Sequence, residues 1–144
     1  MKRTAIKHKP PDMQVISRQA WKLMSRYVRL SGDLNGEWRC VTCGKPYSDI
    51  RDISAGHFKH DGTKNKSNPV SYDGRNVWPQ CTSCNTFGNG KLDIYAEKLV
   101  ERYGPDILSE LSRIKHSSLK GKDKREFFTN KIAELTEKLA DMEE

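Results

Sequence analysis

The chain has 144 residues, of which 35% are hydrophobic and 31% are charged. That length fits one compact domain with a helical extension, and the low apolar content predicts a modest core. No apolar run approaches the ~20 residues needed to span a bilayer, and nothing resembles a signal peptide, so we expect a cytoplasmic protein without a membrane partner. The formal net charge of +7 is compatible with a nucleic-acid partner and equally with a basic surface that has none.

The N-terminal part of the chain combines a basic arm with an amphipathic helix. Residues 1–11 are rich in lysine and end in two prolines that disfavour a helix, so we expect an irregular arm. Asp12 can cap a helix that runs to about Leu30. Its predicted apolar face comprises Ile16, Ala20, Leu23, Tyr27 and Leu30. Its far side carries Arg18, Lys22, Arg26 and Arg29. This basic side would either meet phosphates or be an ordinary solvated surface.

The rest of the chain is predicted to hold a small strand pair followed by helices. The predicted elements are strands over 52–58 and 76–80, a loop over 59–71 whose Lys59, Lys64 and Lys66 can reach phosphates, and helices over 91–103, from 105 onward and over 123–141. The last helix has an apolar stripe of Phe128, Ile132, Leu135, Leu139 and Met142. So short a stripe favours packing on the same chain over a dimer seam. We therefore expect a core over 12–104 and a C-terminal helical extension over 105–144.

All four cysteines fall in two Cys-x-x-Cys pairs, Cys40 with Cys43 and Cys81 with Cys84. Two such pairs can close a tetrahedral site around Zn²⁺, an ion that thiolates bind well. The alternative is two disulfides, which a reducing cytosol disfavours. We therefore predict a structural zinc site that ties two distant segments together, so that zinc binding contributes directly to folding.

Three polar residues stand at ordered positions around these cysteine pairs. His57 is predicted to end the first strand, Asn76 to begin the second, and Asn85 directly follows Cys84. This order of knuckles, strands and helix is that of the ββα-metal (HNH) nuclease motif. Hydrolysis of a phosphodiester needs a base, a group that positions it and a hard cation. His57, Asn76 and Asn85 are the candidates for these three tasks, although each taken alone would more often be structural. The predicted fold is α+β, a zinc-stabilised HNH core with long flanking helices, predominantly helical.

Several short motifs carry a more specific resemblance. They are Cys40-x-x-Cys43-Gly, Ala55-Gly56-His57-Phe58, Arg75-Asn76-Val77, Gln80-Cys81-x-x-Cys84-Asn85 and Gly90-x-Leu92-x-x-Tyr95. Over about residues 38–104 the chain resembles the phage NinG/Rap recombination endonucleases, and its cysteine and asparagine pattern is similar to phage endonuclease VII. The resemblance implies structural zinc on the four cysteines, a general base at His57 and catalytic Mg²⁺ or Mn²⁺ at Asn85. It also implies a DNA endonuclease that cuts branched recombination intermediates such as Holliday junctions, as a homodimer because resolving a junction requires two active sites.

The chain departs from these families at two positions. Many HNH enzymes carry a metal ligand immediately before the catalytic histidine, where this chain has Gly56. NinG-like chains carry a histidine soon after the last knuckle, where this chain has Phe87. Asp52, His60 and Asp61 are the alternative sources of the missing ligand.

Two further expectations concern the surroundings of the site. Phe58, Trp78 and Phe87 are expected to pack around the metal rather than to stack on nucleobases. The main alternative function is a non-catalytic zinc-knuckle protein that binds DNA. A redox or disulfide scaffold is the third possibility, and it predicts no bound zinc.

Overall fold

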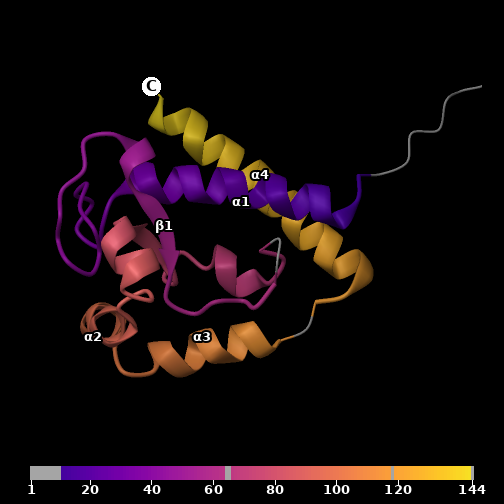
Figure 1. Cartoon of the computed structure of the whole chain (residues 1–144). Coiled ribbons are helices and arrows are strands. Elements are labelled where there is room, and N and C mark those ends of the chain that lie inside the picture. Colours follow the sequence, from indigo (N-terminus) through magenta and orange to yellow (C-terminus); the bar gives the residue numbers. More distant parts are fainter. Residues whose placement is uncertain (1–10, 64–65, 118, 144) are drawn as a thin grey trace, which may run out of the picture.

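The protein is α+β and mostly helical, with one two-stranded antiparallel sheet (Figure 1). The computed structural model describes residues 11–63, 66–117 and 119–143, so the predicted basic arm, apart from Pro11, and Lys64 lie outside the described residues. In chain order the elements are α1 (Met13–Ser31), η1 (Ile50–Asp52), β1 (Ser54–His57), η2 (Pro69–Tyr72), β2 (Val77–Gln80), η3 (Ser83–Phe87), α2 (Leu92–Tyr103), α3 (Ile107–His116) and α4 (Gly121–Met142). The predicted α+β class, predominantly helical, and the order of the predicted strands and helices are thereby confirmed. Figure 1 shows α1 and α4 on one side of β1 and α2 and α3 on the other.

Helix α1 begins and ends where the sequence predicts, but its buried face is rotated. Asp12 caps the helix by accepting a hydrogen bond from the Gln14 backbone N–H at 3.4 Å. The fully buried residues are Ile16, Ser17, Ala20, Met24 and Val28. The predicted apolar residues Leu23, Tyr27 and Leu30 are only half-buried. The buried stripe therefore follows an i, i+4 spacing that passes through Met24 and Val28.

Helix α4 packs along α1, which confirms that the last helix packs on the body of the chain. Phe128 and Leu135 of α4 join the buried residues of α1 in one core, together with Tyr72 and Val77 from the middle of the chain. The Tyr72 hydroxyl donates to the Ser17 carbonyl at 3.1 Å and so ties η2 to α1. The prediction was wrong for the last residue of the apolar stripe, since Met142 is 42% exposed.

A second core lies on the other side of the sheet. Its buried members are Val41, Val70, Tyr95, Leu99, Ile107 and Leu111, from the first knuckle, η2, α2 and α3. Arg75, just before β2, donates to Asp73 and to Glu110 of α3, which anchors the strand pair to this helix layer. Within the described part of the chain, no helix has the length and apolar character needed to cross a membrane.

The two strands are shorter than predicted and approach each other closely on the α2 side. β1 pairs with β2 so that Gly56 lies opposite Trp78 and His57 opposite Val77. A Cβ atom added to Gly56 would lie 2.8 Å from Gln80 Cβ and would collide with the Gln80 amide oxygen. Gln80 is fully buried, and its amide nitrogen donates to the Thr42 hydroxyl at 3.1 Å and to the Gly90 carbonyl at 2.7 Å. Gln80 thus occupies the space that any side chain at position 56 would need.

We predict that Gly56→Ala destabilises the fold by about 1–3 kcal/mol, because the added methyl group overpacks a buried contact with Gln80. The measurement is the free energy of unfolding in urea. Gly74→Ala is the matched control, since a Cβ there meets nothing within 4 Å. In the Gln80→Ala background the Gly56→Ala substitution should cost much less. Equal stability of the Gly56→Ala and Gly74→Ala proteins would contradict this account.

Candidate functional site

The two cysteine pairs converge into one cluster. The four sulfur atoms of Cys40, Cys43, Cys81 and Cys84 lie within 4.8 Å of one another, and Cys43 Sγ is 3.6 Å from Cys81 Sγ. In a tetrahedral site with Zn–S bonds of about 2.3 Å, the sulfur atoms lie about 3.8 Å apart. The first knuckle closes through a hydrogen bond from the Gly44 N–H to the Cys40 carbonyl at 2.9 Å. Gly44 has a φ of +77°, a conformation that favours glycine.

The chemistry of this cluster also fits a zinc ion. None of the four cysteines is joined in a disulfide. Burial raises the pKa of the Cys40 thiol, but hydrogen bonds from the Thr42 hydroxyl and from nearby backbone groups outweigh burial and lower it to about 6. A thiol that ionises readily is a good metal ligand. Burial raises the pKa of the Cys43 thiol to about 12 and also raises that of Cys84, so a bound cation would be needed to keep all four sulfur atoms as thiolates. Among the described residues, this is the one group of three or more histidine, cysteine or acidic side chains close enough to share an ion.

His57 ends β1 and faces α1 in a buried, positively charged environment. Its side chain is only 4% exposed and stacks on Trp21, with ring centroids 4.6 Å apart. Burial lowers the pKa of His57 to about 4, and the charges of Lys66 and His60 act in the same direction, against Asp61 and a hydrogen bond to the Ser71 backbone. The imidazole is therefore neutral at pH 7. Its Nε2 atom is buried and has no hydrogen-bond partner in the described part of the chain.

Asn76 fixes the chain segment that follows His57. Its side-chain oxygen accepts the Lys59 N–H at 2.7 Å, and its side-chain nitrogen donates to the Lys59 carbonyl and to the Val70 carbonyl, each at 2.9 Å. Its own carbonyl accepts the Phe58 N–H at 2.9 Å. Asn76 is fully buried and thus joins β2, η2 and the end of β1. Since each bond is directed, the position of His57 depends on this one amide.

Asn85 lies in η3, directly after Cys84, the last cysteine of the second pair. Its backbone N–H donates to the Cys81 carbonyl at 2.8 Å, so the knuckle sets its position. The side chain is half-exposed, and its amide takes part in no hydrogen bond among the described residues. The side-chain carbonyl oxygen of Asn85 is therefore available to a hard cation.

Phe87, at the end of η3, corrects one expectation about the aromatic residues. Phe58 and Trp78 are half-buried and pack against the core formed with α2 and α3. Phe87 does not pack around the metal, because it is 81% exposed. No pattern in the sequence indicated this difference, since burial of an aromatic residue in a loop depends on the elements that surround it.

Of the alternative metal ligands, Asp61 is occupied and Asp52 lies at the other end of β1, whereas His60 is near His57. The Asp61 carboxylate accepts hydrogen bonds from Thr63, Asn68 and Ser71, the last at 2.6 Å, and it organises the loop after β1. Asp52 precedes β1 and lines a cavity at the knuckles, whereas His57 ends the strand. The exposed His60 lies near His57, with ring centroids 6.0 Å apart. Position 56 offers no ligand, and Gln80 fills its space.

Trp21 contacts His57, and the sequence did not predict this contact. It lies on α1, outside the segment between the two knuckles, and forms the stacking surface for His57 at an interplanar angle of 29°. It also meets the Tyr72 ring edge-on. No local pattern could identify it, because the contact joins residues far apart in the chain.

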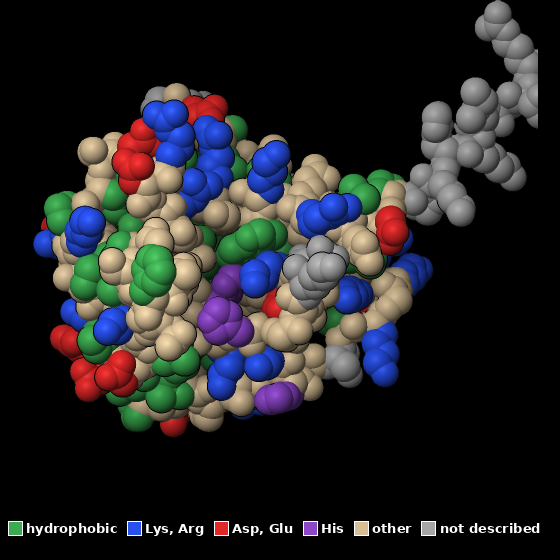
Figure 2. Space-filling view, viewed as in Figure 1, with side chains coloured by type: hydrophobic (Ala, Val, Ile, Leu, Met, Phe, Trp, Pro, Cys, Tyr) green, Lys and Arg blue, Asp and Glu red, His purple; other side chains and the backbone are tan. Residues whose placement is uncertain are grey.

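Basic side chains surround the histidines on one face of the protein. Figure 2 shows histidine side chains near the centre of this face, with lysine and arginine side chains around them. Of the predicted basic side of α1, Arg18 and Lys22 are exposed. Arg26 pairs with Glu143, and Arg29 donates to the Ile50 carbonyl at 2.8 Å. Half of the predicted basic stripe is therefore used within the protein.

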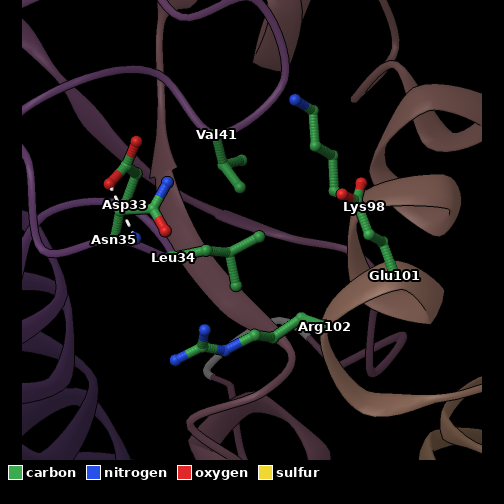
Figure 3. Close-up of a pocket in the computed structure, with 7 residues that line it drawn as sticks. All are labelled: Asp33, Leu34, Asn35, Val41, Lys98, Glu101 and Arg102. Carbon is green, nitrogen blue, oxygen red and sulfur yellow. Dashed lines mark hydrogen bonds between the residues drawn. The ribbon is translucent and has the colours of Figure 1, made fainter.

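A cavity of about 250 Å³ lies away from these residues, between the loop after α1 and helix α2 (Figure 3). Its lining residues are Asp33, Leu34, Asn35, Val41, Lys98, Glu101 and Arg102. The two acidic and two basic side chains balance each other in charge, and none of the predicted site residues lines the cavity. This cavity is therefore not the candidate site: His57 lies at the end of β1 and Asn85 in η3, and among the described residues no hydrogen bond joins the two.

We predict that the protein binds one zinc ion per chain and that Cys81→Ser abolishes both zinc binding and cooperative folding. The reason is that structural zinc supplies about 10–16 kcal/mol, as much as the whole stability of a small domain. Elemental analysis gives the zinc content, and circular dichroism with and without a chelator reports folding. The exposed Ser83, in the same knuckle, provides the control Ser83→Ala. A folded, zinc-free Cys81→Ser protein would disprove the structural role.

We also predict that the stability contributed by His57 is lost in acid. The folded-state pKa of about 4 lies below the ordinary value of 6.5, so between these values the unfolded chain binds a proton that the folded chain does not. Stability from this group is therefore complete above pH 6.5 and falls by up to about 3 kcal/mol as the pH drops toward 4. Urea unfolding across this range should show a shallower pH dependence for His57→Gln than for the exposed control His116→Gln. Identical slopes would contradict the assignment.

Comparison with known proteins gives a family. The family model described as Bacteriophage Lambda NinG protein matches residues 1–143. The chain is 28% identical over 94 residues to Protein ninG of Escherichia phage 933W, a match that covers 65% of this chain and 43% of that protein. It is 29% identical to Protein ninG of Salmonella phage P22 and 27% identical to that of Escherichia phage lambda, each over 65% of this chain and 42% of the relative.

These matches span less than half of the length of the curated relatives. No solved structure matches the chain. The family model, in contrast, extends over almost the whole sequence and includes both cysteine pairs, His57, Asn76 and Asn85. The chain therefore belongs to the NinG family of bacteriophage proteins.

Proposed function

We propose that this protein is a metal-dependent DNA endonuclease of the HNH class, with zinc as a structural ion and Mg²⁺ or Mn²⁺ as the catalytic ion. The observation that carries the proposal is the state of His57, a neutral imidazole at the end of a two-stranded hairpin. Its Nε2 has no hydrogen-bond partner among the residues that the structure describes. The hairpin lies between two cysteine knuckles and leads into a helix. This is the arrangement that an HNH nuclease needs.

In the proposed reaction His57 acts as the general base. Its Nε2 accepts the proton of a water molecule whose oxygen attacks the phosphorus atom. Trp21 holds the ring plane, and Asn76 holds the backbone beyond it. A pKa near 4 makes the free imidazole a weak base, but an adjacent DNA phosphate favours the imidazolium form and raises that pKa. Because Nε2 is buried in the free protein, binding of DNA must displace the side chains that cover it.

The Asn85 side-chain oxygen would hold the catalytic cation, with phosphate oxygens and water as the remaining ligands. When bound, such an ion neutralises the negative charge that develops on the leaving oxygen. The available amide of Asn85 and its position on the zinc knuckle support this assignment. The buried Gln80 replaces any ligand at position 56, so the protein would contribute fewer ligands than other HNH sites.

The proposed substrate is branched DNA such as a Holliday junction. The positive net charge and the basic side chains around the histidines favour a polyanion. Cutting both strands of a junction requires two active sites, and we therefore propose that the protein acts as a homodimer. The resemblance to junction-cutting endonucleases over the knuckle region supports the choice of branched over plain DNA.

A non-catalytic DNA-binding protein is the alternative function. The covered Nε2 of His57 and the lack of a ligand at position 56 favour this alternative. On this account zinc would hold a DNA-binding surface, and His57 would be a structural residue packed on Trp21. The two functions make the same prediction for DNA affinity and opposite predictions for cleavage.

We predict that the wild-type protein cleaves a four-way junction in Mg²⁺ or Mn²⁺ and that His57→Ala reduces the rate by about 10²–10⁴-fold, since a general base contributes that much. The assay compares junction, flap, duplex and single-stranded substrates at one salt concentration. Zinc content and junction affinity should be unchanged in His57→Ala. His116→Ala, at an exposed histidine of α3, is the control and should cleave normally. If the wild-type protein binds DNA and cuts none of the substrates, the alternative function is correct.

A further inference from the structure

The segment from Asn85 to Lys91 presents a large aromatic ring to solvent beside the candidate site. Phe87 is 81% exposed, and the next most exposed large hydrophobic residue of the described chain, Val15, is 47% exposed. Burying such a ring would stabilise the fold by about 1.5–3 kcal/mol. Phe87 is two residues from Asn85, within the same turn. The exposed Phe87 ring therefore does not contribute this stability to the fold, although it lies close in the chain to Asn85, the proposed metal ligand.

The backbone around Phe87 is held in an unusual conformation. Three successive residues are left-handed, Asn89 with φ +54°, Gly90 with φ +86° and Lys91 with φ +48°. Left-handed conformations are unfavourable for residues other than glycine and persist where the surroundings enforce them. Here the Gly90 N–H donates to the Cys84 carbonyl at 2.8 Å, and its carbonyl accepts from Gln80 at 2.7 Å. The zinc knuckle and the buried Gln80 thus fix the turn that displays Phe87.

A positive charge accompanies the exposed ring. The Lys91 side chain lies over Gly88, since its Cε would be 2.7 Å from a Cβ atom built there. Lys91 itself is exposed, and its N–H donates to the Gly88 carbonyl at 3.0 Å. The ammonium group is therefore adjacent to the residue that follows Phe87. An exposed aromatic ring next to a cation is the combination with which proteins bind unstacked nucleobases and their phosphates.

We propose that Phe87 stacks on an unstacked nucleobase of DNA at the branch point, with Lys91 on the adjacent phosphate, and that this contact selects branched DNA over continuous duplex. A base at a branch exposes its face at little cost, whereas a base inside a duplex must first be unstacked. The ring thereby places the nearby phosphodiester next to Asn85. The inference rests on the proposed function only in taking DNA as the ligand.

The experiment measures binding in the His57→Ala background, so that its outcome does not depend on cleavage. The probes are a four-way junction with 2-aminopurine at the branch and a continuous duplex of the same sequence, both at one fixed salt concentration. Phe87→Ala and Phe87→Leu should each raise the Kd for the junction about tenfold, because both remove the aromatic face. Phe87→Tyr retains that face and should stay within about twofold of the parent protein. The Kd for the duplex should change less than about twofold in every variant.

The matched control is Tyr103→Ala, which removes an aromatic ring that is 39% exposed at the other end of α2. Helix α2 has 12 residues, so this ring lies about 18 Å along the helix from the turn. The control should bind the junction as the parent protein does. In the parent complex 2-aminopurine fluorescence should be lower than in the Phe87→Ala complex, because stacking on the ring quenches the base.

Two results would overturn the inference: junction binding by Phe87→Leu as tight as that of the parent, or an equal loss of affinity for junction and duplex. Zinc content and circular dichroism of each variant separate these results from misfolding. The stacking pattern without any cleavage by the wild-type protein would refute the proposed function alone. Cleavage without the stacking pattern would refute this inference alone.

Discussion

The convergence of the two cysteine pairs is the constraint on which the rest of the site depends. Cys43 and Cys81 are 38 residues apart in the chain, yet their sulfur atoms lie 3.6 Å from each other. Holding these points together closes a loop that contains both strands, η2 and the Asn76 network. Closing a loop of this length costs conformational entropy, and a metal ion shared by the four cysteines would offset that cost through strong, directed bonds. The third small core, of Cys40, Ile53, Cys81 and Cys84, is formed largely by the ligands themselves.

A two-stranded sheet is marginally stable alone, and here the surrounding helices provide the hydrophobic packing that stabilises it. His57 and Val77 point toward α1 and α4, while Gly56 and Trp78 point toward α2 and α3. The alternation explains why adjacent residues have such different roles. His57 gains its aromatic neighbour and its depressed pKa on one side, whereas Gly56 is pressed against Gln80 on the other. The site is thus a property of both helix layers, although its residues lie on one hairpin.

Hydrophobic periodicity and the capping and turn residues were sufficient to predict the main helices and the two strands. The spacing of the two Cys-x-x-Cys pairs was sufficient to predict the cysteine cluster. Asp12 and the apolar stripe of α4 are local signals, and the structure follows them except at Met142. The contacts that define the environment of His57 are not local. Trp21 reaches His57 from α1, and nothing in the spacing of that helix distinguishes it from an ordinary packing residue. Gln80 packs against Gly56 on the opposite face of β1, and its place in a motif beside Cys81 did not indicate that contact. Phe87 was misjudged for a related reason, since residue type predicts burial only on average.

The pairing of α1 with α4 has a consequence for the order in which the molecule is built. Two hydrogen bonds join these helices across more than a hundred residues, from Arg26 to Glu143 and from Arg125 to the Pro11 carbonyl. At ribosomal rates, roughly 5–20 s separate the synthesis of the two helices. During that interval the buried face of α1 is not yet covered by α4. The position of Trp21, which stacks on the His57 ring, is therefore less firmly held. Both cysteine pairs precede α4 in the chain, so the knuckles can form before α4 is synthesised, whereas the helix that carries Trp21 gains its packing against α4 only afterwards.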